Sequence, residues 1–287
     1  MMFSSWLEEI HQPSISEDDI LNLKDISPKR ICFNTTHKNA LTREDGPNWV
    51  GHFKVPFLET IGPIFTGMTG LKLYKDNFGR YWRSIKDEQE FNIIKNWIDD
   101  VENIVFIRSY LALSIALSEY IGNEAERTEI GHLEYEAKYN KDKKAIIELV
   151  KKLLKIIKKL PYFINADYIC AVPPSSGKDF DLPSVLAKGL CQQLNKINLT
   201  PDLKWEHYKK SLKSLPLDKK LEALKDANLI VSNTNLNGKK VLIIDDLYQS
   251  GYTVHYVGMK LLEKGVSQVY NIALVKSRRD SDNLQMD

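Results

Sequence analysis

The sequence predicts an α/β protein built on a parallel sheet flanked by helices. Three short apolar runs are typical of strands buried on both faces: Tyr168 to Val172, Val241 to Ile244 and Ala273 to Val275. Helical apolar patterns separate these runs, for example over residues 143–160 and 184–196. Such alternation indicates βαβ units, in which the parallel strands end at the same edge of one sheet.

The chain has 287 residues, 43% of them hydrophobic and 27% charged, which suits one large or two modest globular domains. The most apolar segment, from Ile104 to Leu117, predicts a core helix, and a polar break follows at Gly122 to Arg127. We therefore expect a boundary near residue 125. Residues 1–125 form an N-terminal accessory domain, an α+β extension of unknown fold, and residues 126–287 carry the α/β pattern.

Several protein classes are disfavoured by composition. A net charge of +2 gives no strong field for nucleic acid, and the three cysteines are far apart, without the spacing of a zinc site or a disulfide framework. The N-terminus lacks the basic and apolar regions of a signal peptide, so we expect a cytoplasmic protein. The Ile104 to Leu117 segment contains Arg108 and is too short to cross a bilayer, so no membrane association is expected.

The most informative motif follows the apolar run Val241 to Ile244. Asp245 and Asp246 come at the end of this strand, and a short turn then leads into a helical pattern that stops at Gly265. Two carboxylates can accept hydrogen bonds from neighbouring ribose hydroxyls. Ser250, Thr253 and the amides around Gly251 can donate to a phosphate at a helix N-terminus. The motif therefore predicts a sugar-phosphate site.

A plainer interpretation of these residues stays open. A buried strand can end in a solvated pair of aspartates without binding anything, although the full pattern is much rarer than the pair alone. His255 lies two residues after Thr253, in the first turn of the helix. It either approaches the phosphate or, as is more common, caps or packs the helix.

A second loop leaves the Tyr168 to Val172 strand at the same predicted edge. Its hydroxyl, amide and lysine donors suit a pyrophosphate, because ligands in open α/β sheets gather at the carboxyl ends of strands. The alternative is a proline-rich strand exit with a surface lysine. The loop residues in question are Pro174, Ser175, Ser176, Gly177 and Lys178.

Residues 241–253 resemble the signature of the type I phosphoribosyltransferases: an apolar strand, two acidic residues and a phosphate loop of the Thr/Ser-Gly-any-Thr type. Within that family, the chain looks most similar to the ComF-like competence proteins. This closer resemblance is carried by supporting segments over 131–139, 166–176 and 273–276. The resemblance covers residues 126–287.

The resemblance implies a type I phosphoribosyltransferase-like fold and binding of phosphoribosyl pyrophosphate with Mg²⁺. It implies transfer of the 5-phosphoribosyl group to a nitrogen nucleophile, a nucleobase or related acceptor, with release of pyrophosphate. Asp245 and Asp246 would be the catalytic residues, holding the ribose and the metal, directly or through water. The 5′-phosphate would be bound by Gln249, Ser250, Gly251, Tyr252 and Thr253, and the pyrophosphate by the second loop.

The chain also departs from the family pattern. Purine-salvage members usually carry an acid at the position of Gln249 and a small residue at that of Tyr252. Lys276 resembles the lysine that meets an exocyclic purine oxygen and is our base-binding candidate. Only eleven residues follow it, so we expect no C-terminal hood over the base, and closure of the acceptor pocket by the N-terminal part or a partner. The N-terminal cysteine-rich zinc module of many ComF proteins is missing.

A lysine-rich segment from Trp205 to Ala227 falls where phosphoribosyltransferases keep a mobile lid. A lid is chemically reasonable, because water would otherwise capture an oxocarbenium-like ribosyl centre. Lysines in this segment could also meet the pyrophosphate. For each individual lysine, solvated surface is the commoner outcome.

Other functions stay open. One alternative is a non-catalytic sensor of a phosphoribosyl ligand, or a ComF-like accessory protein in DNA uptake, processing or phage defence. Another is nucleic-acid binding through the basic helix at 143–160 and the lysines of 205–225, although such a helix more often packs on a sheet and keeps its lysines in water. The partners left open are a second copy of the chain, a nucleic acid and another protein.

Overall fold

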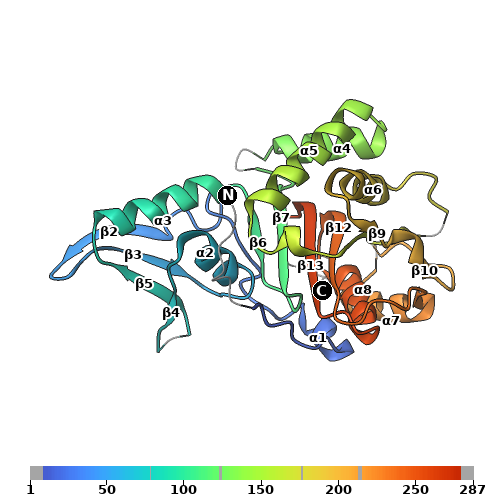
Figure 1. Ribbon diagram of the computed structural model, residues 1–287, viewed down its shortest axis with the longest axis horizontal. Coiled ribbons are helices and arrows are strands. Elements are labelled where there is room, and N and C mark those ends of the chain that lie inside the picture. Colours follow the sequence, from blue (N-terminus) through green and yellow to red (C-terminus); the bar gives the residue numbers. More distant parts are fainter. Residues whose placement is uncertain (1–8, 78, 123–124, 176, 213–214, 279–287) are drawn as a thin grey trace.

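The computed structural model describes residues 9–77, 79–122, 125–175, 177–212 and 215–278. A seven-stranded sheet with helices on both faces forms its centre, and a four-stranded sheet stands beside it (Figure 1). This confirms the predicted α/β class and the N-terminal α+β extension. In spatial order the central strands are β1 (Arg30–Ile31), β6 (Val105–Ile107), β7 (Leu113–Glu119), β13 (Gln268–Lys276), β12 (Lys240–Tyr248), β8 (Tyr168–Ala171) and β9 (Ile197–Asn198).

The central sheet is mostly parallel. Strands β7, β13, β12, β8 and β9 run in the same direction, whereas β6 is antiparallel to both of its neighbours. The carboxyl ends of β8, β12 and β13 therefore meet at one edge of the sheet. The acidic pair Asp245 and Asp246 and the loop after β8 lie at this edge.

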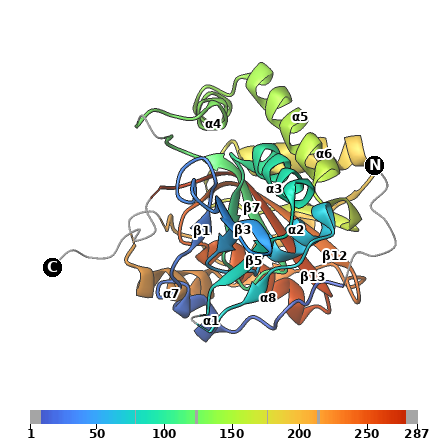
Figure 2. The ribbon, with the colours of Figure 1, turned by 90° about the vertical axis from the view of Figure 1, so that its left-hand side faces the viewer.

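Strand β12 is buried on both faces, as its apolar run predicts. Val241 and Ile243 belong to the core on one face, together with α1 (Glu17–Asn22), α7 (Leu217–Ala227) and α8 (Tyr252–Glu263). Leu242 and Ile244 belong to the core on the other face, together with α4 (Glu129–Tyr139), α5 (Lys143–Lys159) and α6 (Leu182–Leu194). Figure 2 shows these two groups of helices on opposite sides of the sheet.

Side chains cap the helices that cover the second face. In α4, α5 and α6 the residue before the helix accepts a hydrogen bond from an amide of the first turn, which satisfies a donor left without an intrahelical partner. The bonds join Thr128 Oγ1 to Gly131 N, Asp142 Oδ1 to Ala145 N, and Asp181 Oδ2 to Ser184 N.

The basic helix α5 packs as predicted. Its apolar stripe, which includes Leu149, Leu153 and Ile157, is buried in the core against the sheet layer. Its lysines lie at the outside, and Lys151 is well exposed. The interpretation of this helix as a covering element is confirmed.

The four-stranded sheet is antiparallel and belongs to the first part of the chain. Its strands, in spatial order, are β2 (Leu41–Gly46), β3 (Trp49–Val55), β5 (Tyr81–Ile85) and β4 (Tyr74–Lys75), and it packs with α2 (Ile61–Thr69) and α3 (Glu88–Val101). Trp97 of α3 makes an edge contact with Phe65 of α2, at 5.0 Å between ring centroids, and a tilted contact with Phe106 of β6 at 5.9 Å. The aromatic core of this lobe is thus continuous with the central sheet.

The apolar segment from Ile104 to Leu117 is not a helix, and that prediction is wrong. It forms the antiparallel strands β6 and β7, joined by the turn around Arg108. A short apolar run that is buried on both faces of a sheet has no periodicity to distinguish it from a buried helix. The β-branched and aromatic residues Val105, Phe106 and Ile107 are the signal that favours a strand.

The remaining elements lie beyond β8. The ribbon of β10 (Leu203–Trp205) and β11 (Leu229–Val231) brackets α7, and two short 3₁₀ turns occupy 163–165 and 200–202. In the described part of the chain, no helix combines the length and the apolar character needed to cross a membrane.

The division of the chain at residue 125 stays a prediction. The central sheet takes β1, β6 and β7 from before this position and β8, β9, β12 and β13 from after it. In particular, β7 pairs with β13 over Leu113 to Glu119. A fragment that starts at residue 126 would therefore lack the strand beside β13.

We expect the fragment of residues 126–287 to aggregate, because it exposes the edge of β13 and the buried side chains Tyr270 and Ile272. Size-exclusion chromatography and far-UV circular dichroism of the fragment and the full chain test this. A monomeric fragment that unfolds cooperatively would instead support two separable domains.

Candidate functional site

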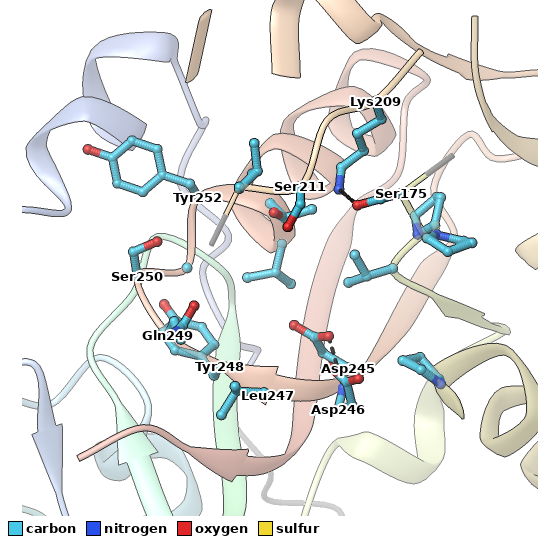
Figure 3. Close-up of a pocket in the computed structure, with 18 of the residues that line it drawn as sticks. Ser175, Lys209, Ser211, Asp245, Asp246, Leu247, Tyr248, Gln249, Ser250 and Tyr252 are labelled. Carbon is cyan, nitrogen blue, oxygen red and sulfur yellow. Dashed lines mark hydrogen bonds between the residues drawn. The ribbon is translucent and has the colours of Figure 1, made fainter. Parts of the chain in front are cut away.

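One cavity of about 270 Å³ lies at the carboxyl edge of the central sheet. It is bordered by the loop after β8, the end of β12, the turn into α8 and the segment before α7 (Figure 3). The predicted sugar-phosphate and pyrophosphate loops thus face the same space. Its charged lining residues are Lys178, Asp181, Lys209, Lys220, Asp245 and Asp246.

The acidic pair points to both faces of the sheet, because successive residues of a strand alternate. Asp245 follows Ile243 on the α8 side, and its Oδ1 accepts a hydrogen bond from the backbone N–H of Asp246 at 2.9 Å. Asp246 lies on the α4 side, where its Oδ2 is 2.6 Å from Lys138 Nζ. Lys138 also contacts Glu134 Oε1 at 3.0 Å, one turn earlier in α4.

The two aspartates differ in their surroundings. Burial, together with the negative charge of Asp246, raises the pKa of Asp245 above its ordinary value. Burial lowers the pKa of Lys138, but the charges of Asp246 and Glu134 outweigh it, and the net result is a raised pKa that keeps the ammonium charged.

The turn from β12 into α8 has the form expected of a phosphate loop. Gly251 precedes the helix with φ of 81°, and no side chain caps the N-terminus of α8. Gln249, Ser250, Gly251 and Thr253 border the cavity, and so does the backbone at Tyr252. The phenol of Tyr252 points away, towards α1, where its Oη donates to Leu21 O at 3.4 Å (Figure 3).

The buried side chain of His255 contacts this turn from the protein interior. Its Nδ1 lies 2.8 Å from Gly251 O, and its Nε2 accepts a hydrogen bond from Tyr110 N at 3.2 Å. Complete burial lowers the pKa of His255 to about 4, so the ring is neutral and Nδ1–H donates to the carbonyl. The packing interpretation of His255 is confirmed, and the histidine does not border the cavity.

The predicted pyrophosphate loop, after β8, contributes Pro174, Ser175 and Lys178 to the cavity lining. Gly177 has φ of 81° and is exposed, and Ser176 lies outside the described residues. The loop is tied to the segment after β10, because Trp205 Nε1 donates to Pro173 O at 3.3 Å.

Lys209 makes a second hydrogen bond between the segment after β10 and this loop, because its Nζ donates to Ser175 Oγ at 3.3 Å (Figure 3). Only 5% of Lys209 is exposed. Burial, with the nearby charge of Lys178, lowers its pKa to about 8.

Sequence reasoning did not single out Lys220, Asp181 or Lys138. Lys220 is a buried residue of α7 and Asp181 is the cap of α6, and both border the cavity. Lys209 and Lys220 fall in the lysine-rich segment predicted to form a lid, so composition was the available signal there. Lys138 lies in the segment 131–139 that supported the family resemblance, but the sequence assigned it no role, because only the packing of α4 against the sheet brings it to Asp246.

Lys276 does not border the cavity. It is 1% exposed, and its Nζ donates to Ser277 O at 2.8 Å. On the neighbouring strand it pairs in register with Glu119, which is ion-paired with Arg30 at 3.0 Å. The assignment of Lys276 as the residue that binds the nucleobase stays a prediction.

A metal would find few protein ligands here. Within the described ranges, no group of three or more His, Cys, Asp or Glu side chains is arranged to hold a metal ion. Asp245 and Asp246 are the carboxylates that border the cavity near the expected ribose position. Mg²⁺ commonly keeps several waters and relies on one or two carboxylates plus substrate phosphates, so the pair fits such a metal only together with a phosphorylated ligand.

No protein-family model and no curated protein matches the chain. Solved structures with a similar fold include adenine phosphoribosyltransferase from Leishmania donovani, 11% identical, with a TM-score of 0.36 over 57% of this chain and 83% of that one. A hypothetical protein from Neisseria gonorrhoeae with bound ppGpp is 15% identical, with a TM-score of 0.31 over 48% and 70%. UMP synthase from Leishmania donovani is 16% identical, with a TM-score of 0.31 over 66% and 34%.

Phosphoribosyltransferases are thus among the structural neighbours of this chain, at low sequence identity. At these identities and TM-scores the likenesses identify neither a substrate nor a reaction. The ComF-like grouping stays a prediction.

We expect Gly251→Val to abolish binding of ribose 5-phosphate. The positive φ disfavours a β-branched residue, and a Cβ at this position would lie 2.6 Å from Tyr248 Cζ, so the turn must move. Thermal shift with ribose 5-phosphate measures the effect. Gly238→Val is the matched control, because Gly238 also has a positive φ but lies away from the cavity. Equal stabilisation of parent and Gly251→Val would show that this turn binds no phosphate.

We expect the affinity for phosphoribosyl pyrophosphate to fall as pH rises through about 8, because Lys209 then loses the proton that attracts the anion. The sign follows from its lowered pKa: the charged form dominates below that value and disappears above it. Calorimetric titrations of the parent and of Lys209→Arg across this range test it, since arginine stays charged. The same decline in both proteins would assign the pH dependence to another group.

Proposed function

We propose that the chain binds phosphoribosyl pyrophosphate with Mg²⁺ and transfers its 5-phosphoribosyl group to a nitrogen nucleophile, a nucleobase or related acceptor. The observation that carries this proposal is the convergence on one cavity of the acidic pair, the uncapped N-terminus of α8 and the loop after β8. Each suits a different part of the same ligand. We further propose that the protein acts in the cytoplasm.

The 5′-phosphate is assigned to the turn before α8. Backbone N–H groups at a helix N-terminus favour an anion, and Ser250 and Thr253 add hydroxyl donors. The neutral His255 holds the carbonyl of Gly251 and so fixes the shape of the turn. No cationic side chain is needed at this end of the ligand.

The ribose hydroxyls are assigned to Asp245 and Asp246. A carboxylate next to the anomeric carbon stabilises positive charge as the bond to pyrophosphate lengthens. In the reaction the bond between the anomeric carbon and the pyrophosphate oxygen breaks, a bond to the acceptor nitrogen forms, and that nitrogen loses a proton.

The pyrophosphate is assigned to the loop after β8 and to the lysines opposite it. Ser175 and Lys178 lie on the loop, with Ser176 and Gly177 as further predicted donors, and Lys209 and Lys220 come from the other wall of the cavity. Mg²⁺, when bound, neutralises charge on the departing pyrophosphate. The segment around Lys209 and Ser211 closes this side against water.

Incubation with phosphoribosyl pyrophosphate, Mg²⁺ and a panel of nucleobases, with pyrophosphate release as the readout, tests the proposal. Asp245→Asn should keep the fold, because an amide has nearly the same shape as a carboxyl group, and should slow release about a hundredfold, because it removes a negative charge beside the anomeric carbon. Asp226→Asn, an exposed aspartate of α7, is the control and should change nothing.

Two other outcomes are informative. Binding of phosphoribosyl pyrophosphate without release of pyrophosphate for any base would favour the non-catalytic sensor or accessory protein. Absence of binding in the presence and absence of Mg²⁺ would contradict the assignment of the site. A second copy of the chain or another protein that supplies the acceptor pocket would show as release that depends on protein concentration.

A further inference from the structure

The acidic pair already has a cation beside it. Lys138 Nζ lies 2.6 Å from Asp246 Oδ2 and 3.0 Å from Glu134 Oε1. The lysine side chain is 17% exposed and the Glu134 side chain 3%, so the group is largely shielded from water. The attraction between charges shielded in this way is screened less by water and salt than the attraction between charges on an open surface.

The position of this ammonium is fixed by the fold. Glu134 and Lys138 are one turn apart on α4, and α4 packs against β13 and β7 beside β12. Thr128 caps the start of the helix, and its Oγ1 also donates to Glu119 O at 2.6 Å, at the end of β7. Lys138 is thus held against the sheet edge by its own helix and not by a loose loop.

An ammonium at this place competes with a metal. Mg²⁺ bound directly to Asp246 would need a carboxylate oxygen at about 2.1 Å and would stand next to the positive charge of Lys138. Asp246 and Glu134 together carry two negative charges, of which Lys138 neutralises one. Without the lysine, Glu134 and Asp246 would lose the cation that they share, and the added negative charge would favour binding of a divalent cation.

We propose that Lys138 is the resident cation of the acidic pair and a positioning residue for the ribose. It holds Asp246 in place to accept a hydrogen bond from a ribose hydroxyl without a divalent metal. Mg²⁺ would then be needed only for binding of the pyrophosphate group. This inference rests on the proposed function and goes further, because it separates metal-free binding of the sugar phosphate from metal-dependent binding of pyrophosphate.

The first test is calorimetric titration with ribose 5-phosphate, in EDTA and in Mg²⁺. The parent protein should bind ribose 5-phosphate with the same affinity in EDTA and in Mg²⁺. Lys138→Gln should bind ribose 5-phosphate about tenfold more weakly in EDTA, because it loses a charge-assisted contact that orients Asp246. Its affinity should return to that of the parent in Mg²⁺, because the metal can take the place of the ammonium. Lys138→Arg should retain metal-free binding. Lys152→Gln is the matched control and should behave as the parent, because it removes a lysine of α5 that is paired at 2.8 Å with Glu129 of α4, away from the acidic pair.

The second test is titration with Mn²⁺ alone, followed by its paramagnetic resonance. Lys138→Gln should bind Mn²⁺ more tightly than the parent, and adding Asp246→Asn should remove the gain. If Lys138→Gln fails to fold because Glu134 and Asp246 then repel, Lys138→Gln/Glu134→Gln removes that repulsion. This double variant should still lose metal-free binding of ribose 5-phosphate.

The outcomes separate this inference from the proposed function. A parent that binds ribose 5-phosphate only with Mg²⁺, or that binds Mn²⁺ as tightly as Lys138→Gln, overturns the role of Lys138 and leaves the phosphate site intact. Metal-free binding by Lys138→Gln that equals the parent also overturns it. A parent that binds ribose 5-phosphate under neither condition overturns both the inference and the site.

Discussion

The burial of β12 on both faces determines where polar chemistry can occur in this protein. Val241 to Ile244 lie between two helix layers and exclude water and charge, so functional side chains can appear only where the strand leaves the core. Asp245 and Asp246 occupy the first two positions after this run. Because the strands beside β12 are parallel, their exits open at the same edge, and one cavity collects the loops of β8 and β12.

The same half-buried position explains why the two aspartates have different surroundings. Two ionised carboxylates in adjacent positions of low polarity repel, and each loses hydration. The protein resolves this by pairing one of them, Asp246, with Lys138, while the pKa of Asp245 rises. Opposite them, Lys209 is buried near Lys178 and has a lowered pKa. An anionic ligand would oppose this effect and keep Lys209 charged to a higher pH.

The sequence allowed prediction of the features that depend on local patterns, and it failed where only tertiary packing decides. The apolar run and the turn around Gly251 are continuous in sequence, so β12, the turn that follows it and the start of α8 could be predicted. The segment from Ile104 to Leu117 was misassigned because burial on both faces removes the periodicity on which strand prediction depends. Lys220 borders the cavity from α7 and Lys138 contacts Asp246 from α4, and no spacing in the sequence encodes either contact.

Contacts from the first part of the chain reach the turn around Gly251. The amide of Tyr110 donates to His255 Nε2, and His255 Nδ1 donates to Gly251 O, so two hydrogen bonds join the turn between β6 and β7 to this glycine. The phenol of Tyr252 donates to Leu21 O in α1. A turn that must present its N–H groups to an anion is costly to order at the moment of binding. These contacts order the turn before a ligand binds. Residues before 125 therefore help to build the candidate site, whether or not they also contact the acceptor.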